Sequence, residues 1–225
     1  MIKQLFSRIQ RKNAGQSFVE LALVILILAL MLSGVVEFGF LLNSYLKVLD
    51  STREGARYAS NGLPFQWDDV LGDYVSLQTF YENTAIESIL TMSPVVLNGN
   101  RGDDLVISVF TVGGTPSDPT IVRWPAGYSF GWNLCENRGD TNIEQHINLA
   151  DWTSCSPKRS KFSTSQVLLL MNPNAPGSGI VLVEVFYNYP QLLKLPVFEQ
   201  VIPDPIPVYT YSMMPISSAE PTPVP

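Results

Sequence analysis

The sequence predicts an α+β protein in which a long N-terminal transmembrane helix precedes a small extracytoplasmic domain with an antiparallel β-sheet and one packed helix. Three observations support this fold class. An apolar stretch of helical length begins near residue 21, a second segment at 77–91 has apolar residues partly at helical spacing, and strand-like segments follow at 105–112 and 179–189.

Charge is scarce in this chain and unevenly placed. Only 15% of the 225 residues are charged, against roughly 25% in typical soluble proteins. Four basic residues stand close to the N-terminus: Lys3, Arg8, Arg11 and Lys12. Without these four charges the formal net charge falls from −6 to −10. Because phosphate binding requires a basic face, the acidic remainder argues against nucleic acid as a partner.

The chain has one apolar stretch long enough to cross a membrane. From Leu21 to Val36 it reads LALVILILALMLSGVV without a charge, and its continuation to Leu42 adds only Glu37. A membrane-spanning helix needs about 20 mainly apolar residues. The stretch is apolar on every side, which excludes a surface helix. A buried core helix and a cleaved secretory signal are the alternatives, although the stretch exceeds a signal core and no A-x-A-like site follows it closely.

Charges on either side of the apolar stretch predict its orientation. Basic residues precede it, whereas the flank after it mixes both signs. Since Lys and Arg stay on the cytoplasmic side, the N-terminus is expected inside and everything after about residue 42 outside. The predicted location is therefore a single pass through the inner or cell membrane, with the lipid bilayer as a partner.

Two acidic residues, Glu20 and Glu37, lie at the ends of the apolar stretch. They are 17 residues apart, which is about 26 Å along a helix and close to the thickness of the hydrocarbon core. The carboxylates are thus expected near opposite faces of the membrane, where a charge costs less than at the centre. At about 100° per residue they point from different helix faces and cannot form one acid–base pair. The alternative for Glu37 is an interfacial residue in water.

The segment directly before the apolar stretch is Gly15-Gln16-Ser17-Phe18-Val19-Glu20. It resembles the prepilin peptidase site of type IV pilins and their relatives. The resemblance implies cleavage between Gly15 and Gln16, so that residues 1–15 form a basic leader and Glu20 becomes the fifth residue of the mature chain. It also implies an assembly ion pair between Glu20 and the N-terminal amine of an adjacent subunit, which low dielectric would make specific.

A wider resemblance links this site to later pieces of the same helix: Val19-Glu20, Glu37-Phe38-Gly39 and Arg53-Glu54-Gly55-Ala56-Arg57-Tyr58-Ala59. Over about residues 15–60 the chain resembles the TadE-like proteins, which are pilin-like parts of the tight-adherence (Tad) pilus apparatus. An early proline often seen in such segments is absent. Contacts with helices of partner subunits are expected at these positions: Glu37, Gly39, Arg53, Glu54 and Arg57. The alternative for the last three is a solvated helical face.

These patterns divide the chain into four parts: a prepilin leader at 1–15, a pilin-like transmembrane helix at 16–60, an extracytoplasmic α+β domain at 61–202, and a Pro-rich disordered tail at 203–225. The helix is expected to continue to Ala59, over roughly 65 Å.

Within the outer domain, Gly113-Gly114 is expected to end the strand at 105–112, and residues 115–164 are expected to form a loop-rich insertion. Residues 165–171 and 179–189 are predicted to be strands, and the second carries apolar groups on both faces, as a central strand does. Aromatic residues of the insertion and its edges are expected to form a small core: Trp124, Tyr128, Phe130, Trp132 and Trp152.

The chain shows little sign of ligand or catalytic chemistry. Cys135 and Cys155 are the only cysteines and His146 is the only histidine, so no metal site is expected. The two cysteines are predicted to form a disulfide if the domain lies in an oxidising compartment, and two separately buried thiols are the alternative. No catalytic triad, phosphate loop or paired-carboxylate motif is recognisable. No cofactor and no enzymatic activity are predicted.

The resemblance implies a structural function. The chain is expected to be a minor pilin or pseudopilin of a Tad-type pilus that a prepilin peptidase processes and that packs with other pilin-like subunits. Its location would be the membrane first and the extracellular pilus after processing. The alternative is an uncleaved, membrane-anchored receptor whose outer domain binds a ligand.

Overall fold

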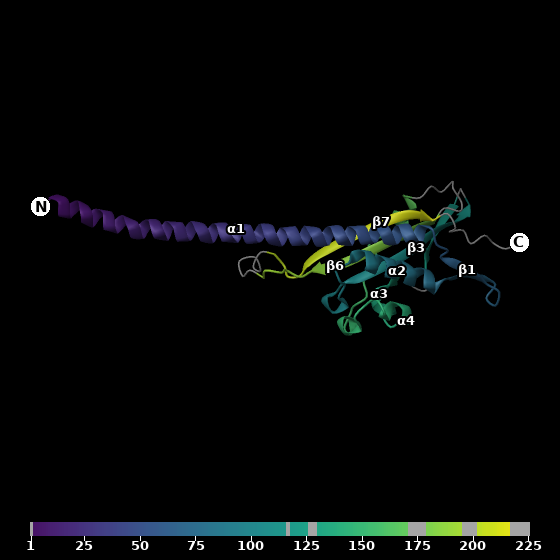
Figure 1. Cartoon of the computed structure of the whole chain (residues 1–225). Helices are drawn as coiled ribbons and strands as arrows, with labels where there is room; N and C mark the ends of the chain where they lie inside the picture. The colour runs from purple at the N-terminus through teal and green to yellow at the C-terminus, as the bar shows by residue number, and fades with distance from the viewer. Residues whose placement is uncertain (1, 116–117, 126–129, 171–178, 195–201, 217–225) are drawn as a thin grey trace. The chain divides into compact units, whose positions relative to one another are not determined.

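The computed structural model describes residues 2–115, 118–125, 130–170, 179–194 and 202–216. The fold is α+β as predicted, with a long N-terminal helix followed by an antiparallel sheet and several short helices (Figure 1). The chain forms two compact units. The first unit comprises Met1–Asn43 and Gln191–Pro203, and the second comprises Ser44–Pro190 and Asp204–Pro225.

Helix α1 runs from Ile2 to Ser60 without interruption. Within its apolar part the hydroxyl of Ser33 donates to the carbonyl oxygens of Ala29 and Leu30, both at 2.9 Å, so the side chain needs no partner from water. The helix ends where the Gly62 N–H bonds the Ala59 carbonyl at 2.9 Å. The predicted end at residues 59–60 is therefore confirmed.

The main sheet has four long antiparallel strands in the order β4-β3-β6-β7. Their bounds are Asp104–Thr115 for β3, Asp118–Trp124 for β4, Gly179–Tyr189 for β6 and Ile206–Ile216 for β7. A short strand β5, Trp132–Asn133, pairs with β3. Strand β6 lies between β3 and β7 and is buried on both faces, which confirms the predicted central strand.

Two predictions about the sheet are wrong. Gly113-Gly114 does not end β3, because both residues pair with β4, opposite Thr120 and Pro119. The predicted disordered tail at 203–225 instead contains β7, which pairs with β6 along its whole length. Prolines are tolerated in β7 because it is an edge strand, where a missing N–H breaks no ladder. Residues 217–225 lie outside the described part of the chain.

One face of the sheet is covered by helix. The hydroxyl of Thr210 on β7 donates to the carbonyl oxygen of Val48 on α1 at 3.4 Å, so the C-terminal part of α1 lies on this face. Helix α2, Gln78–Met92, matches the predicted helix at 77–91. Its fully buried Tyr81 stacks on Trp132 of β5, with ring centroids 6.4 Å apart. These contacts form the main core of the second unit.

The opposite face of the sheet is covered by a short helix, α5, Thr164–Leu168. Its Val167 packs with Phe110 and Leu182 in a buried cluster. A strand was predicted at 165–171, and this prediction is wrong. Ser163 and Gln166 form a reciprocal capping box that begins a helix instead. Met171 lies outside the described residues.

The insertion at 115–164 is more regular than predicted. Beyond β4 and β5 it contains α3 at Leu134–Asn137, α4 at Thr141–Glu144 and a 3-10 turn, η2, at Leu149–Trp152. Trp132 and Trp152 are fully buried and Trp124 is partly buried, but Trp132 stacks on Tyr81 of α2 in the main core, so a separate aromatic core of the insertion stays a prediction. Phe130 is 41% exposed and does not belong to that core. Tyr128 lies outside the described residues.

A small hairpin follows α1. Strand β1, Phe65–Asp68, pairs with β2, Asp73–Ser76. The Asp68 carboxylate accepts the N–H groups of Val70 and Leu71 at 2.8 and 3.1 Å, which fixes the turn. Val70 at the tip of this turn is 94% exposed.

Candidate functional site

The predicted cleavage site lies inside helix α1, in an exposed segment. Residues 15–20 are all exposed, and nothing lies within 4 Å of where a Cβ on Gly15 would stand. The side-chain amide of Gln16 donates to the Glu20 carboxylate at 3.1 Å, one helical turn away. The structure therefore places Gly15, Gln16 and Glu20 next to one another on an accessible stretch.

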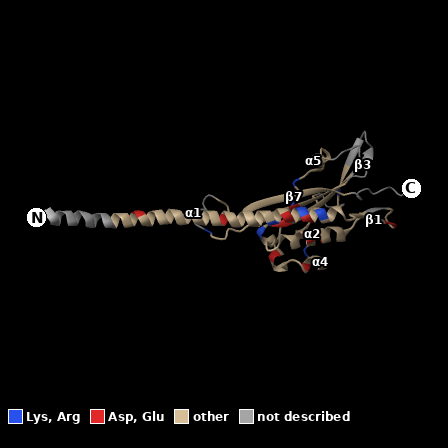
Figure 2. Ribbon diagram, turned by 45° about the horizontal axis from the view of Figure 1, so that its top comes forward, with Lys and Arg blue, Asp and Glu red and all other residues tan. Residues whose placement is uncertain are grey.

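The apolar stretch of α1 is exposed along its length. Gly15–Ser60 qualifies as a candidate membrane span, with a mean hydropathy of 2.7 in its most apolar window and none of that window buried. Phe18 and Val35, for example, are 73% and 69% exposed. In Figure 2 this stretch of α1 is almost entirely uncharged, whereas charges of both signs gather toward the C-terminal end of the helix. Such a surface is unstable in water and needs lipid or other helices around it.

Glu37 contacts a segment of its own chain. Its Oε1 accepts the N–H of Leu192 and its Oε2 accepts the N–H of Leu193, both at 2.9 Å. These residues belong to the connection between β6 and β7 and to the same unit as Glu37. Gly39, two positions on, has nothing within 4 Å of a would-be Cβ. The predicted partner contacts at Glu37 and Gly39 thus stay predictions, and Glu37 also has an internal role that the sequence did not indicate.

The charged end of α1 is a solvated face. Arg57 and Glu54 form an ion pair three residues apart, and their side chains are 64% and 30% exposed. The hydrogen bond from Arg57 lowers the pKa of Glu54, and the same bond raises the pKa of Arg57. Arg53 is also exposed. The exposure of these side chains matches the solvated-face alternative. The side chains also remain accessible to other molecules.

The face of α1 opposite these charges carries residues that the sequence analysis missed. The buried positions recur every three or four residues, as one helical stripe requires, and most are small: Val48, Ser51, Thr52, Gly55, Ala56 and Ala59. At Gly55, a Cβ would stand 2.0 Å from the Ser88 Oγ and 3.6 Å from the Thr84 carbonyl oxygen of α2. Gly55 therefore permits the close approach of α1 to α2. The regular spacing of small residues in the sequence is the signal that could have predicted this packing.

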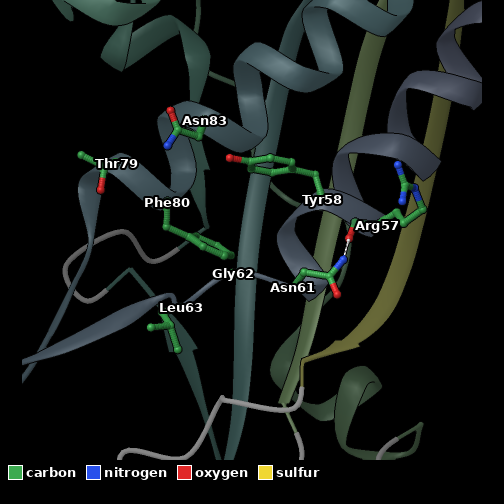
Figure 3. Close-up of a pocket in the computed structure, with 8 residues that line it drawn as sticks. All are labelled: Arg57, Tyr58, Asn61, Gly62, Leu63, Thr79, Phe80 and Asn83. Atoms are coloured by element: carbon green, nitrogen blue, oxygen red, sulfur yellow. Dashed lines mark hydrogen bonds between the residues drawn. The ribbon is translucent and has the colours of Figure 1, made fainter.

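A cavity of about 360 Å³ lies at the C-terminal end of α1 (Figure 3). Its lining comes from the end of α1, the following turn and the start of α2: Arg57, Tyr58, Asn61, Gly62, Leu63, Thr79, Phe80 and Asn83. The side-chain amide of Asn61 donates to the Arg57 carbonyl oxygen at 3.0 Å. Among the residues that the structure describes, this lining contains no carboxylate, histidine or cysteine that could form an acid–base pair.

The family comparison bears on α1 directly. Residues 15–57 match the sequence model of the TadE-like protein family. This segment is TadE-like. The match confirms, for this segment, the resemblance stated above. No curated protein and no solved structure matches the chain.

The TadE-like segment therefore combines three features on one helix. It begins at the predicted cleavage glycine, continues through the exposed apolar stretch and ends with the Arg-Glu-Gly-Ala-Arg piece. In that last piece the charged residues face solvent, while Gly55 and Ala56 face the core of the second unit. The segment thus contains both the candidate membrane span and the part of α1 that packs in the second unit.

A disulfide closes the insertion on itself, and one buried carboxylate of β3 holds the closed segment against the sheet. Cys135 and Cys155 form a disulfide with Cα atoms 5.9 Å apart. Fully buried Asp104 accepts N–H groups from Leu105 at 2.9 Å, Cys135 at 3.1 Å and Lys158 at 2.7 Å. Burial raises the pKa of the Asp104 carboxyl to about 7, and the backbone N–H donors oppose that rise. Asp104 thus joins β3 to the two ends of the disulfide-linked segment.

Replacing Asp104 with asparagine is expected to destabilise the domain by about 1–3 kcal/mol. The asparagine oxygen can still accept from Leu105 and Cys135, but its NH₂ group would face the Lys158 N–H with no acceptor between them. Urea unfolding of the full chain in detergent, followed by near-UV circular dichroism, measures the effect. Asp140→Asn is the matched control, because this helix-capping side chain accepts one N–H, from Asn142, and asparagine caps equally well. Equal unfolding midpoints for the two variants would refute the assigned role of Asp104.

Proposed function

We propose that this chain is a minor pilin or pseudopilin of a Tad-type pilus. A prepilin peptidase processes it, and it packs through α1 with other pilin-like subunits in the pilus or at its assembly base, where it supports pilus biogenesis and adhesion. The observation that carries the proposal is the exposed apolar helix inside the TadE-like segment. A helix that is stored in lipid and later packs against similar helices keeps this surface out of water at both stages.

The geometry around Gly15 supports processing. The leader contains the four basic residues that hold the N-terminus in the cytoplasm. Cleavage after Gly15 removes these charges and lowers the barrier to moving the helix out of the bilayer. It also leaves a free amine on Gln16, close to the Glu20 carboxylate that the Gln16 side chain already contacts. In a bundle of mature helices each Glu20 would then have cationic amines within reach.

Replacing Gly15 with leucine is expected to abolish processing, because a bulky side chain would occupy the position that the peptidase reads. The chain is purified from membranes of a host that has the peptidase, and its intact mass and N-terminal sequence are determined. The wild-type protein should begin at Gln16, and the variant should retain Met1. Gly39→Leu is the matched control, since Gly39 lies on the same helix and also has open space around it.

Two results would count against the proposal. Normal cleavage of the Gly15→Leu chain would show that the site lies elsewhere. A wild-type chain that keeps its leader beside an active peptidase would favour the membrane-anchored receptor instead. Immunogold labelling of sheared filaments then tests whether the processed chain enters the pilus.

A further inference from the structure

Leu192 and Leu193, which follow β6, lie against α1 near the end of the apolar stretch. Glu37 is 16 residues beyond Leu21, or about 24 Å along the helix. A hydrocarbon core is about 30 Å thick. If α1 spans a bilayer from the beginning of this stretch, Glu37 and the segment bound to it lie near the extracytoplasmic surface of that bilayer.

The segment held by Glu37 presents apolar side chains. Leu192 and Leu193 are 57% and 41% exposed, and Ile202 on the returning limb is 37% exposed. The neighbouring surface of α1 has the same character, with Phe38 63% exposed. These residues continue the apolar surface of the span outward onto a second piece of chain.

The polar groups of this segment are paired in a way that suits a poorly hydrated site. Each oxygen of the Glu37 carboxylate accepts one backbone N–H, from Leu192 and Leu193. The buried side chain of Gln191 donates to the carbonyl oxygens of Ile202 and Pro203, at 3.4 and 3.1 Å, and joins the two limbs of the connection. In water such groups would be hydrated at little cost, but at a lipid interface unpaired N–H and C=O groups are costly.

We propose that residues 191–194 form a membrane-contact element that Glu37 fastens to the span, so that Leu192 and Leu193 enter the outer leaflet. The inference rests on the proposed membrane anchoring of α1. The element contacts lipid, because its exposed leucines are continuous with the lipid-facing surface of the helix. Two leucine side chains inserted into lipid add affinity for the membrane surface without adding a second membrane-spanning helix. The element therefore holds the start of the outer domain close to the membrane.

The test uses the full chain in phosphatidylcholine vesicles with some phosphatidylglycerol. Both native cysteines are in the disulfide, so a new cysteine takes a thiol-reactive NBD fluorophore alone. The fluorophore is placed at Leu193→Cys, at Phe38→Cys on the helix and at Val70→Cys on the exposed hairpin turn. Lipids with a nitroxide near the headgroup end of the acyl chain quench a fluorophore only where it enters the outer leaflet.

Quenching at position 193 is expected to approach that at position 38 and to exceed that at position 70 several-fold. Adding Glu37→Gln, which removes one of the two carboxylate acceptors, should lower the quenching at 193 several-fold and leave that at 38 unchanged. Quenching at 193 as weak as at 70, while 38 is quenched, would overturn the inference and leave the anchor intact. A lack of quenching at 38 as well would reject the anchor itself.

A second copy of the chain is the rival occupant of the leucines. In that case the shielding of position 193 would come from protein and would disappear as the chain is diluted in lipid. Emission at 193 that stays blue-shifted, with nitroxide quenching that is independent of the protein-to-lipid ratio, supports the membrane-contact element. Emission that shifts to the red on dilution, without nitroxide quenching, overturns it.

Discussion

Replacing Gly55 with valine is expected to destabilise the second unit by about 3 kcal/mol. The new Cβ would fall 2.0 Å from the Ser88 Oγ and 3.3 Å from the Ser88 Cβ, so α1 and α2 would have to separate. Separation would also loosen Ala56 and Ala59, which are fully buried beside this contact. The measurement is urea unfolding of the full chain in detergent, followed by the fluorescence of the buried tryptophans.

Three further variants separate crowding at Gly55 from a general effect of valine in the helix. Gly39→Val places the same side chain in open space and should leave the unfolding midpoint unchanged. Gly55→Ala should cost less than valine, and combining it with Ser88→Ala should recover most of that loss, because the Oγ that the new Cβ meets is gone. A Gly55→Val chain as stable as the wild type would show that the two helices do not meet at this point.

Replacing both Cys135 and Cys155 with serine is expected to lower the free energy of unfolding by about 3 kcal/mol. The disulfide joins positions 20 residues apart and so limits the conformations open to the unfolded chain. Because the backbone N–H of Cys135 also donates to Asp104 of β3, removing the disulfide should destabilise the sheet as well as the insertion. Urea unfolding with and without a reducing agent measures it.

The reduced wild-type chain provides the control for this double replacement. It should unfold at the same urea concentration as the serine variant, whereas the oxidised wild type should be more resistant. Limited proteolysis should then cut the insertion first, between the two former cysteine positions. If reduction leaves both the midpoint and the cleavage pattern unchanged, the disulfide contributes nothing to stability.

The elements with a strong local pattern were predictable from the sequence. The apolar stretch predicted α1, and apolar residues on both faces predicted β6 as a central strand. The errors arose where tertiary pairing outweighs local preference. Gly113-Gly114 extends β3 because β4 pairs with it, and β7 forms despite its prolines because β6 supplies a partner along its whole length.

The candidate site was predictable only in part. The solvated side chains of Arg53, Glu54 and Arg57 match an alternative that their residue types had suggested. The contact of Glu37 with Leu192 and Leu193 was not predictable, because it joins positions about 155 residues apart in the chain. No local spacing encodes such a contact, and only the folded chain brings the carboxylate to those two N–H groups.

The prolines of β7 have a consequence for how copies of this protein can crowd together. β7 ends the strand order of the main sheet, and Pro207 and Pro215 stand near its two ends. Because proline has no N–H to donate, a neighbouring molecule cannot continue the ladder through these positions. Edge-to-edge growth of the sheet into fibrous aggregates is thereby discouraged, so crowded molecules remain free to associate through other surfaces.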